Sequence, residues 1–369
     1  MPEEITESQP ISPTPPGQII LPGESPDQER RPSKKVIIAL SVIVAIVYCA
    51  LLVTIFHKPK KAPATNVAPT SAATVNQVSK STAQNTPKVE GLQLDTTKNY
   101  GNKYANGLLP VGDSKYVTDT GKKGNIYVCH ANFVPAGQAG AQTRGPWFTN
   151  NNTQYDLNKK SHIAGSIDWT QKFSVVIQNG KRIITTNDLP NHPTGVFPVA
   201  ASDPAKKYDA NPNSIQTQSM VYNLTAEPTY GAPQCMGGEV GVMLTGVALF
   251  DGFDAGGRDA GAWEVQDKCD GHPQNKGEYH YHTLSSCITD TNIKTVIGFG
   301  LDGFPITGPK VGENNILTTD DLDECHGITS EITLDKKTIT MYHYVMTQDF
   351  PYSAGCFRAT ASQPPGKPE

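Results

Sequence analysis

The chain has 369 residues, a formal net charge of −4 and 18% charged residues. A weakly acidic chain in which no basic, aromatic-rich face stands out is not typical of nucleic-acid-binding proteins, so we expect no nucleic-acid partner. The length is sufficient for two domains, but the composition of much of the N-terminal part excludes a packed core there.

Three segments precede the expected globular part. Residues 1–35 are rich in proline and polar residues and have almost no hydrophobic periodicity, which predicts a disordered cytoplasmic leader. Residues 36–56 contain no charge, and at about 1.5 Å per residue they just cross a hydrocarbon core of about 30 Å. We therefore predict a single transmembrane helix. A cleaved signal peptide is the alternative, but the leader is too long for its n-region and the apolar run too long for its h-region. Residues 57–95 have the composition of a flexible linker.

The cysteines decide the expected orientation, because basic residues flank both ends of the apolar run and the positive-inside rule gives nearly a tie. Of seven cysteines, Cys49 lies in the predicted span and the other six follow it. An even number in a loop-rich region favours disulfides and an oxidising compartment, whereas six reduced core cysteines in a cytosolic domain are the alternative. We expect a single-pass cell-membrane protein with its C-terminal domain outside.

Residues 96–358 are predicted to form one mainly β domain with long Gly- and Pro-rich loops, and residues 359–369 a disordered tail. Residues 173–186 are the clearest hairpin, because Asn179-Gly180 accepts the positive φ angles of a type I′ turn. Residues 332–345 predict a second hairpin. No stretch after the apolar run keeps apolar residues at helical spacing for three turns without Gly or Pro. We expect an antiparallel β-sandwich rather than a closed barrel.

A degenerate repeat occupies the C-terminal part of this domain. Each copy has the order Asp-x-Cys-x-Gly, then Tyr-His-Tyr, then Cys: residues 267–271, 279–282 and Cys287, and residues 323–327, 342–344 and Cys356. Coincidence is the alternative. If the two cysteines of each copy pair with each other, the disulfides are Cys269–Cys287 and Cys325–Cys356, and Cys129–Cys235 follows by elimination.

Histidines of the first copy predict a metal site. The period of a β-strand puts His280 and His282 on one face and the flanking tyrosines on the other. Neutral imidazoles are ligands of copper and zinc. We predict His280 and His282 as ligands and His272 as the third, returned towards them by a turn at Gly271. The remaining candidates are Asp270, His326 and His343. A hydrogen-bonded histidine network and acid-base catalysis without metal are the alternatives.

Several ordered motifs resemble the YHYH domain. They include Asp270-Gly271-His272-Pro273, Tyr279-His280-Tyr281-His282-Thr283, Leu322-Asp323-Glu324-Cys325, and the segments 184–195, 211–213, 301–309 and 350–358. The resemblance covers roughly residues 125–358 and implies an extracytoplasmic domain, without implying a reaction. The chain departs from the pattern where Val345 follows Tyr342-His343-Tyr344 and where Thr307, rather than an aromatic residue, precedes Gly308.

The sequence thus predicts a membrane-anchored extracytoplasmic domain that binds copper or zinc. Two other functions stay open. A metal-dependent hydrolase or oxidase would need an open coordination position in a cleft and a nearby acid such as Glu278 or Asp270. A metal-free adhesion or glycan-binding module would show exposed aromatic residues on a groove while the histidines are buried and paired.

Overall fold

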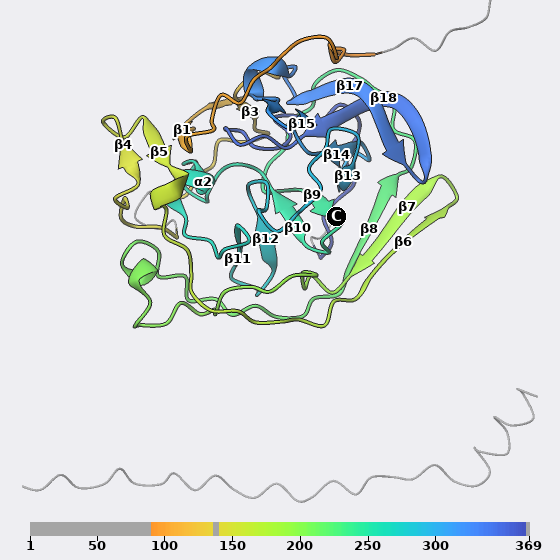
Figure 1. Cartoon of the computed structure of the whole chain (residues 1–369). Coiled ribbons are helices and arrows are strands. Elements are labelled where there is room, and N and C mark those ends of the chain that lie inside the picture. Colours follow the sequence, from red (N-terminus) through yellow and green to blue (C-terminus); the bar gives the residue numbers. More distant parts are fainter. Residues whose placement is uncertain (1–89, 136–139, 367–369) are drawn as a thin grey trace, which may run out of the picture. The chain divides into compact units, whose positions relative to one another are not determined.

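The computed structural model describes residues 90–135 and 140–366 (Figure 1). The predicted leader and membrane span, and the linker up to residue 89, lie outside these residues. Within the described ranges, no helix has both the length and the apolar character needed to cross a membrane. Gln93 forms a β-bridge with Thr329, and the Ser362 backbone N–H donates to the carbonyl of Leu301. The packed structure therefore extends past both predicted domain boundaries, residues 96 and 358.

The fold is mainly β, as predicted, and is organised around one eight-stranded sheet. Its strand order is β11-β12-β10-β9-β13-β14-β18-β17. The strands are β9 (Glu239–Met243), β10 (Ala248–Phe250), β11 (Gly271–Pro273), β12 (Tyr279–Tyr281), β13 (Val296–Gly300), β14 (Pro305–Thr307), β17 (Gly327–Leu334) and β18 (Lys337–Val345). Neighbouring strands are antiparallel except β10 with β12 and β14 with β18, which are parallel. The sequence did not predict these two parallel pairs.

Smaller elements surround this sheet. The three-stranded sheets are β6 (Phe173–Gln178), β7 (Lys181–Thr186) and β8 (Met220–Thr225), and β1 (Leu108–Pro110), β5 (Gln154–Asp156) and β4 (Phe148–Thr149). Two-stranded sheets join β2 (Tyr116–Val117) with β3 (Ile126–Tyr127), and β15 (Lys310–Gly312) with β16 (Asn315–Ile316). The helices among the described residues are α2 (Ala260–Trp263) and three 3-10 turns, Leu157–Lys159, Pro204–Lys207 and Thr319–Asp321.

Both predicted hairpins are confirmed. Strands β6 and β7 pair in antiparallel register across Asn179 and Gly180, whose φ angles of 52° and 71° suit the turn. Strands β17 and β18 pair across Asp335 and Lys336, which also adopt positive φ.

The sheet β6-β7-β8 shares its core with the central sheet. Strand β8 buries Met220, Tyr222 and Leu224 and leaves alternate residues exposed, as the period of two requires. These side chains belong to one core cluster with Val242 of β9 and Phe299 of β13. Full burial of a large apolar side chain stabilises a fold by about 1.5–3 kcal/mol. The shared core agrees with sandwich-like packing, while a complete sandwich stays a prediction.

The central sheet consists of two halves with the same plan. In Figure 1 the teal strands β11-β12-β10-β9 and the blue strands β17-β18-β14-β13 each contain an antiparallel outer pair, a parallel middle pair and an antiparallel inner pair. The two inner strands, β9 and β13, join the halves in antiparallel orientation. The registers also correspond, because His272 faces His280 in one half and Ile328 faces His343 in the other.

The turn before each outer strand is also repeated. Asp267 accepts hydrogen bonds from the backbone N–H groups of Cys269 and Gly271 and from the Tyr279 hydroxyl at 3.0 Å. In the second half, Asp323 accepts the same set from Cys325, Gly327 and the Tyr342 hydroxyl. The sequence repeat therefore corresponds to a repeated structure.

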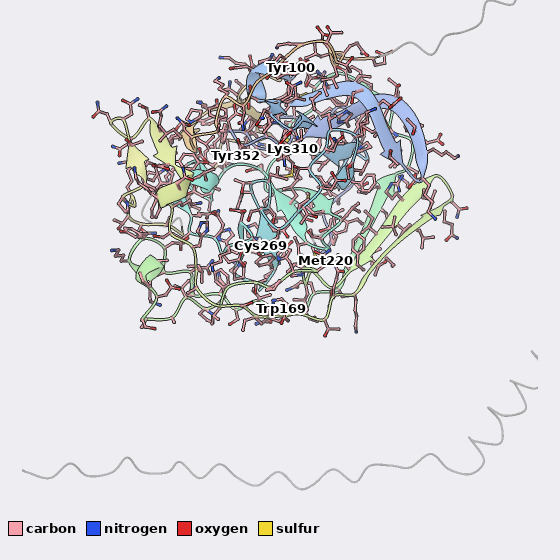
Figure 2. The ribbon with its side chains drawn as sticks, in the orientation of Figure 1. Tyr100, Trp169, Met220, Cys269, Lys310 and Tyr352 are labelled. Atoms are coloured by element: carbon pink, nitrogen blue, oxygen red, sulfur yellow. A yellow bond between two sulfur atoms is a disulfide. The ribbon has the colours of Figure 1, made fainter. Side chains whose placement is uncertain are left out.

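Three disulfides connect the six described cysteines. They are Cys129–Cys235, Cys269–Cys287 and Cys325–Cys356, the same pairings that the repeat predicts. Cys269, labelled in Figure 2, belongs to the first repeated turn, so its disulfide fastens that turn to the segment after β12. The second disulfide does the same after β18.

Candidate metal centre

Two neighbouring strands bring three histidines together. His272 on β11 lies directly opposite His280 on β12, and His282 follows two residues later on the same face. Tyr279 and Tyr281 point the other way, where their hydroxyls contact Asp267 and the Nε2 atom of His192. The predicted division of histidines and tyrosines between two faces is therefore confirmed.

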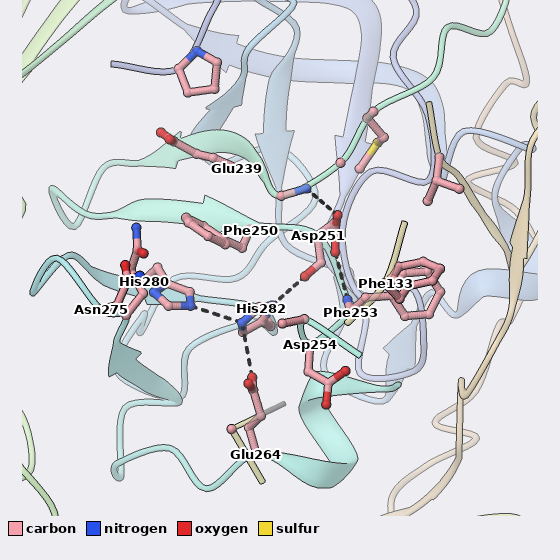
Figure 3. Close-up of a pocket in the computed structure, with 18 of the residues that line it drawn as sticks. Phe133, Glu239, Phe250, Asp251, Phe253, Asp254, Glu264, Asn275, His280 and His282 are labelled. Atoms are coloured by element: carbon pink, nitrogen blue, oxygen red, sulfur yellow. Dashed lines mark hydrogen bonds and ion pairs between the residues drawn. The ribbon is translucent and has the colours of Figure 1, made fainter. Parts of the chain in front are cut away.

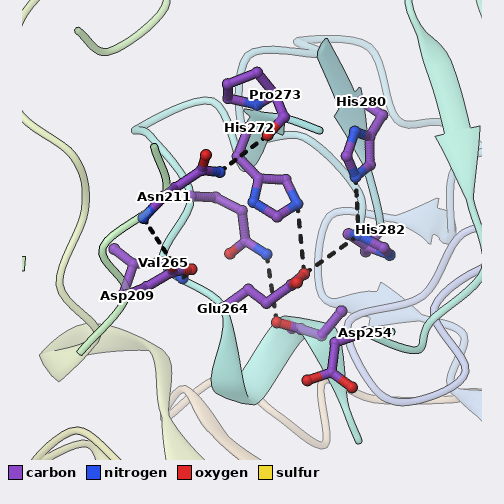
Figure 4. Close-up of polar contacts among 12 residues, drawn as sticks. Asp209, Asn211, Asp254, Glu264, Val265, His272, Pro273, His280 and His282 are labelled. Carbon is purple, nitrogen blue, oxygen red and sulfur yellow. Dashed lines mark hydrogen bonds and ion pairs between the residues drawn. The ribbon is translucent and has the colours of Figure 1, made fainter. Parts of the chain in front are cut away.

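The fourth member of the cluster is Glu264 (Figure 4). Its Oε2 atom is 3.4 Å from His272 Nε2 and 3.3 Å from His282 Nε2, and His280 Nε2 is 3.1 Å from His282 Nε2. For zinc–nitrogen bonds of roughly 2.0–2.1 Å, the edge of a coordination tetrahedron is about 3.3 Å. Three of the six separations among these four atoms are thus close to this edge, and the three histidines alone form the group whose donor atoms all lie within 4.8 Å of one another.

Backbone carbonyls orient two of the imidazoles. His282 Nδ1 is 2.5 Å from the carbonyl oxygen of Asp251, and His280 Nδ1 is 3.3 Å from that of Glu278. A carbonyl can only accept, so each Nδ1 carries the proton and each Nε2 presents a lone pair. Burial lowers the pKa of His282 to about 4 and also lowers the pKa of His280, which disfavours a bridging proton. Two lone pairs 3.1 Å apart are stabilised by a cation between them.

Glu264 and His272 supply further atoms that could bind a metal and that lack hydrogen-bond partners. Among the described residues, Glu264 Oε2 and both ring nitrogens of His272 are buried without a hydrogen-bond partner. Burial, followed by the charges of Asp209 and Asp254, raises the pKa of Glu264, and burial lowers that of His272. An unsatisfied buried polar group costs about 1–3 kcal/mol. A metal ion bound to these atoms would remove that cost.

The short helix α2 positions Glu264. Asp259 caps its first turn by accepting from the Ala262 N–H, and the Glu264 N–H closes the turn on the carbonyl of Ala260. Trp147 Nε1 donates to the carbonyl of Ala262 at 2.7 Å, and Lys160 Nζ donates to that of Gly261 at 2.5 Å. The carboxylate is thus presented by a helix end that is fixed on several sides.

The other predicted ligands lie elsewhere. Asp270 accepts from the Ser286 N–H at 2.8 Å. His326 Nε2 contacts Thr347 Oγ1 at 3.0 Å. His343 lies between Thr307 Oγ1 at 2.9 Å and Ser330 Oγ at 2.8 Å. None of the three belongs to the cluster of His272, His280 and His282 or lines its cavity.

The second half of the sheet carries no equivalent cluster, because two of the three histidine positions hold apolar residues there. Ile328 occupies the position of His272, and Val345 occupies that of His282, so only His343 keeps its counterpart. The hydrogen-bonded network that was the alternative interpretation describes this half. A separate group of His192, Cys269 and Cys287 is not a metal site here, because both sulfur atoms are in a disulfide.

Glu264 was not predicted from the sequence. It follows the apolar run 260–263 and precedes Asp267 and Asp270, which are closer to the histidines along the chain. Nothing in its local pattern separates it from those acids. Its position depends on the contacts that hold α2, such as those from Trp147 and Lys160, which a pattern along one segment does not reveal.

The cluster is open to a cavity of about 1040 Å³ (Figure 3). His272, His280, His282 and Glu264 all contribute to its lining. With these four protein ligands a tetrahedral shell would be complete, so a small molecule in the cavity would reach a bound metal ion as a fifth ligand.

The fold and the cluster together define a mainly β domain with a buried three-histidine, one-glutamate site. A family model described as "YHYH protein" matches residues 221–316, which confirms the YHYH resemblance over a shorter segment than the sequence motifs suggested. The matched segment contains His272, His280, His282 and Glu264, but not β17 or β18. Comparison with curated proteins and with solved structures gave no match.

Proposed function

We propose that the domain binds one copper or zinc ion through His272, His280, His282 and Glu264. The convergence of three neutral imidazoles and one carboxylate, with separations of 3.1–3.4 Å between neighbouring donor atoms, is the observation that carries the proposal. Metal ligands must be deprotonated, and the lowered pKa values of the histidines keep them neutral, whereas Glu264, whose pKa burial raises, would release its proton on binding the metal.

The donor set favours these two metals. Imidazole suits copper and zinc, and a single carboxylate adds the negative charge that offsets part of a dication. Thiolate ligands are absent from the described part of the site, since its nearest cysteines form disulfides. Three disulfides also support placing the domain in an oxidising compartment, with residues 36–56 as its membrane anchor.

A metal-dependent hydrolase or oxidase is the second candidate. The cavity beside the cluster favours it, because a bound metal would have a side open to substrate and water. A metal-free module is less well supported, since His272 is buried without a hydrogen-bond partner among the described residues, whereas that alternative requires paired histidines.

Elemental analysis of the purified full-length protein tests the proposal. We expect about one equivalent of copper or zinc, lost when His280 and His282 are both replaced by Ala. Glu264→Gln keeps the side-chain shape but removes the charge, and should weaken binding by at least the ~10–100-fold that loss of an outer-shell partner costs.

Two variants are controls for this experiment. Tyr279→Phe alters the opposite face of β12, and His343→Gln alters the corresponding histidine of the second half. Both should retain the metal. A folded wild-type protein with intact disulfides that takes up neither metal at micromolar concentration contradicts the proposal.

A further inference from the structure

The cavity beside the candidate metal centre has an aromatic wall. Phe250 stacks on His280 with ring centroids 4.1 Å apart, so it borders the cluster directly. Phe133 and Phe253, labelled in Figure 3, pack edge to face at 5.6 Å on another part of the lining. The cavity volume of about 1040 Å³ is at the upper end of the range of small-molecule sites, roughly 300–1,000 Å³.

The charged residues of the lining all have the same sign. The carboxylates are Asp209, Glu239, Asp251, Asp254 and Glu264. Within the described ranges, neither Lys nor Arg lines the cavity. Arg258 pairs with Asp254 from outside the lining, and Glu264 would be neutralised by a bound metal. Phosphate and carboxylate ligands are normally held by Arg or Lys, so this lining disfavours them.

The entrance adds neutral hydrogen-bonding groups. Asn132 and Asn275 line the cavity and are solvent-exposed. An amide side chain both donates and accepts, which suits a hydroxyl group better than an ion. The polar and aromatic parts of the lining thus favour the same kind of ligand.

We propose that this cavity binds an uncharged organic molecule that has an apolar face and several hydroxyl groups, one of which reaches the open side of the metal. Saccharides and phenols share this chemistry. The proposal rests on the metal site proposed above. The aromatic wall would contact the apolar face, and the carboxylates and amides would accept and donate hydrogen bonds to the hydroxyls.

Gly237 provides a way to fill the cavity without changing the metal ligands. It belongs to the lining, and a Cβ atom added to it meets no described atom within 4 Å. Gly237→Phe therefore adds a ring at the cavity wall with little strain on the backbone. Gly312→Phe is the matched control, because Gly312 lies on β15 outside the lining and its nearest contact would be Asn315 Cβ at 3.4 Å.

The experiment uses full-length, copper-loaded protein in detergent and follows the visible copper absorption during titration. Methyl glucoside and catechol are the neutral probes, and glucose 6-phosphate and 3,4-dihydroxybenzoate are their anionic counterparts. We expect saturable binding of at least one neutral probe, which also distinguishes a saccharide from a phenol site. Its anionic counterpart should bind at least about tenfold more weakly, equivalent to about 1.4 kcal/mol. Gly237→Phe should lose binding but keep its copper, and Gly312→Phe should keep both.

Two failures are distinguishable. A protein that takes up neither copper nor zinc overturns the metal site and this proposal with it. A copper-loaded protein that binds neither neutral probe, or binds the anionic probes as tightly, overturns the cavity proposal alone. Binding that survives in Gly237→Phe also overturns it.

Discussion

The histidines of the two sheet halves differ in what their ring nitrogens face. Both nitrogens of His343 face hydroxyls, Thr307 Oγ1 and Ser330 Oγ, which can donate or accept as the neutral ring requires. His280 and His282 instead face backbone carbonyls with one nitrogen and each other with the second. A neutral ring is thus satisfied within the protein at His343, whereas His280 and His282 turn their Nε2 lone pairs towards each other.

This difference gives a pH prediction for His343. Burial lowers its pKa from 6.5 to about 4. Between these values the unfolded chain binds a proton that the folded protein does not, so the free energy of unfolding falls as pH decreases through this window. At pH 4 this residue alone lowers the free energy of unfolding by about 3 kcal/mol relative to neutral pH. Denaturant unfolding of metal-free protein at pH 7 and pH 4 should show a smaller acid loss in His343→Gln.

The other buried histidines contribute equally in both proteins, so the difference between wild type and variant isolates His343. An equal loss of stability in the two proteins would show that His343 is not neutral and buried in solution.

At the scale of elements, the repeated Asp-x-Cys-x-Gly turn fixes the strand that follows it. Asp270 and His326 occupy corresponding positions with φ angles of 63° and 67°, which non-glycine residues seldom adopt. The carboxylates of Asp267 and Asp323 offset this backbone strain, because each accepts hydrogen bonds from two backbone N–H groups and a tyrosine hydroxyl. In the second half, Arg358 adds an ion pair to Asp323 at 2.6 Å.

Substitutions in the second turn test this account. Tyr342→Phe removes one hydrogen bond to a charged acceptor and should cost about 1.5–3 kcal/mol. Asp323→Ala removes the acceptor of several bonds and one of the two carboxylates that pair with the buried Arg358, the other being Glu324 at 2.6 Å, and should cost about 3–5 kcal/mol. Denaturant unfolding measures both, and elemental analysis should show unchanged metal content. An Asp323→Ala variant as stable as Tyr342→Phe would contradict the assigned role of the ion pair.

Local patterns predicted the features that depend on neighbouring residues. The Asn179-Gly180 hairpin, the alternation of His280 and His282, and the paired cysteines of each repeat follow from spacing along one segment. The proposed ligand set was predicted only in part, because contacts of α2 with residues distant in sequence position Glu264. The candidates His326 and His343 looked equivalent by motif, yet they lie in a half where Ile328 and Val345 replace two ligand positions.

At the scale of the molecule, the two sheet halves share a plan but differ in chemistry. The half that ends in β11 and β12 has all three histidines and a cavity, and the half that ends in β17 and β18 has a single counterpart, His343, with both ring nitrogens hydrogen-bonded. All six cysteines of the described residues are paired. The remaining Cys49 lies in the predicted membrane span, outside the described residues.

This arrangement of cysteines makes the proposed topology testable together with its redox environment. If residues 36–56 anchor the domain outside the cell, protease added to intact cells should remove the domain and leave the N-terminal leader protected. The denatured but unreduced protein should then contain one reactive thiol, Cys49, out of seven cysteines. Thiol labelling followed by mass spectrometry counts it, and complete reduction provides the control with seven. A protected domain with a degraded leader would reverse the orientation, and seven free thiols before reduction would place the domain in a reducing compartment, where these disulfides do not persist.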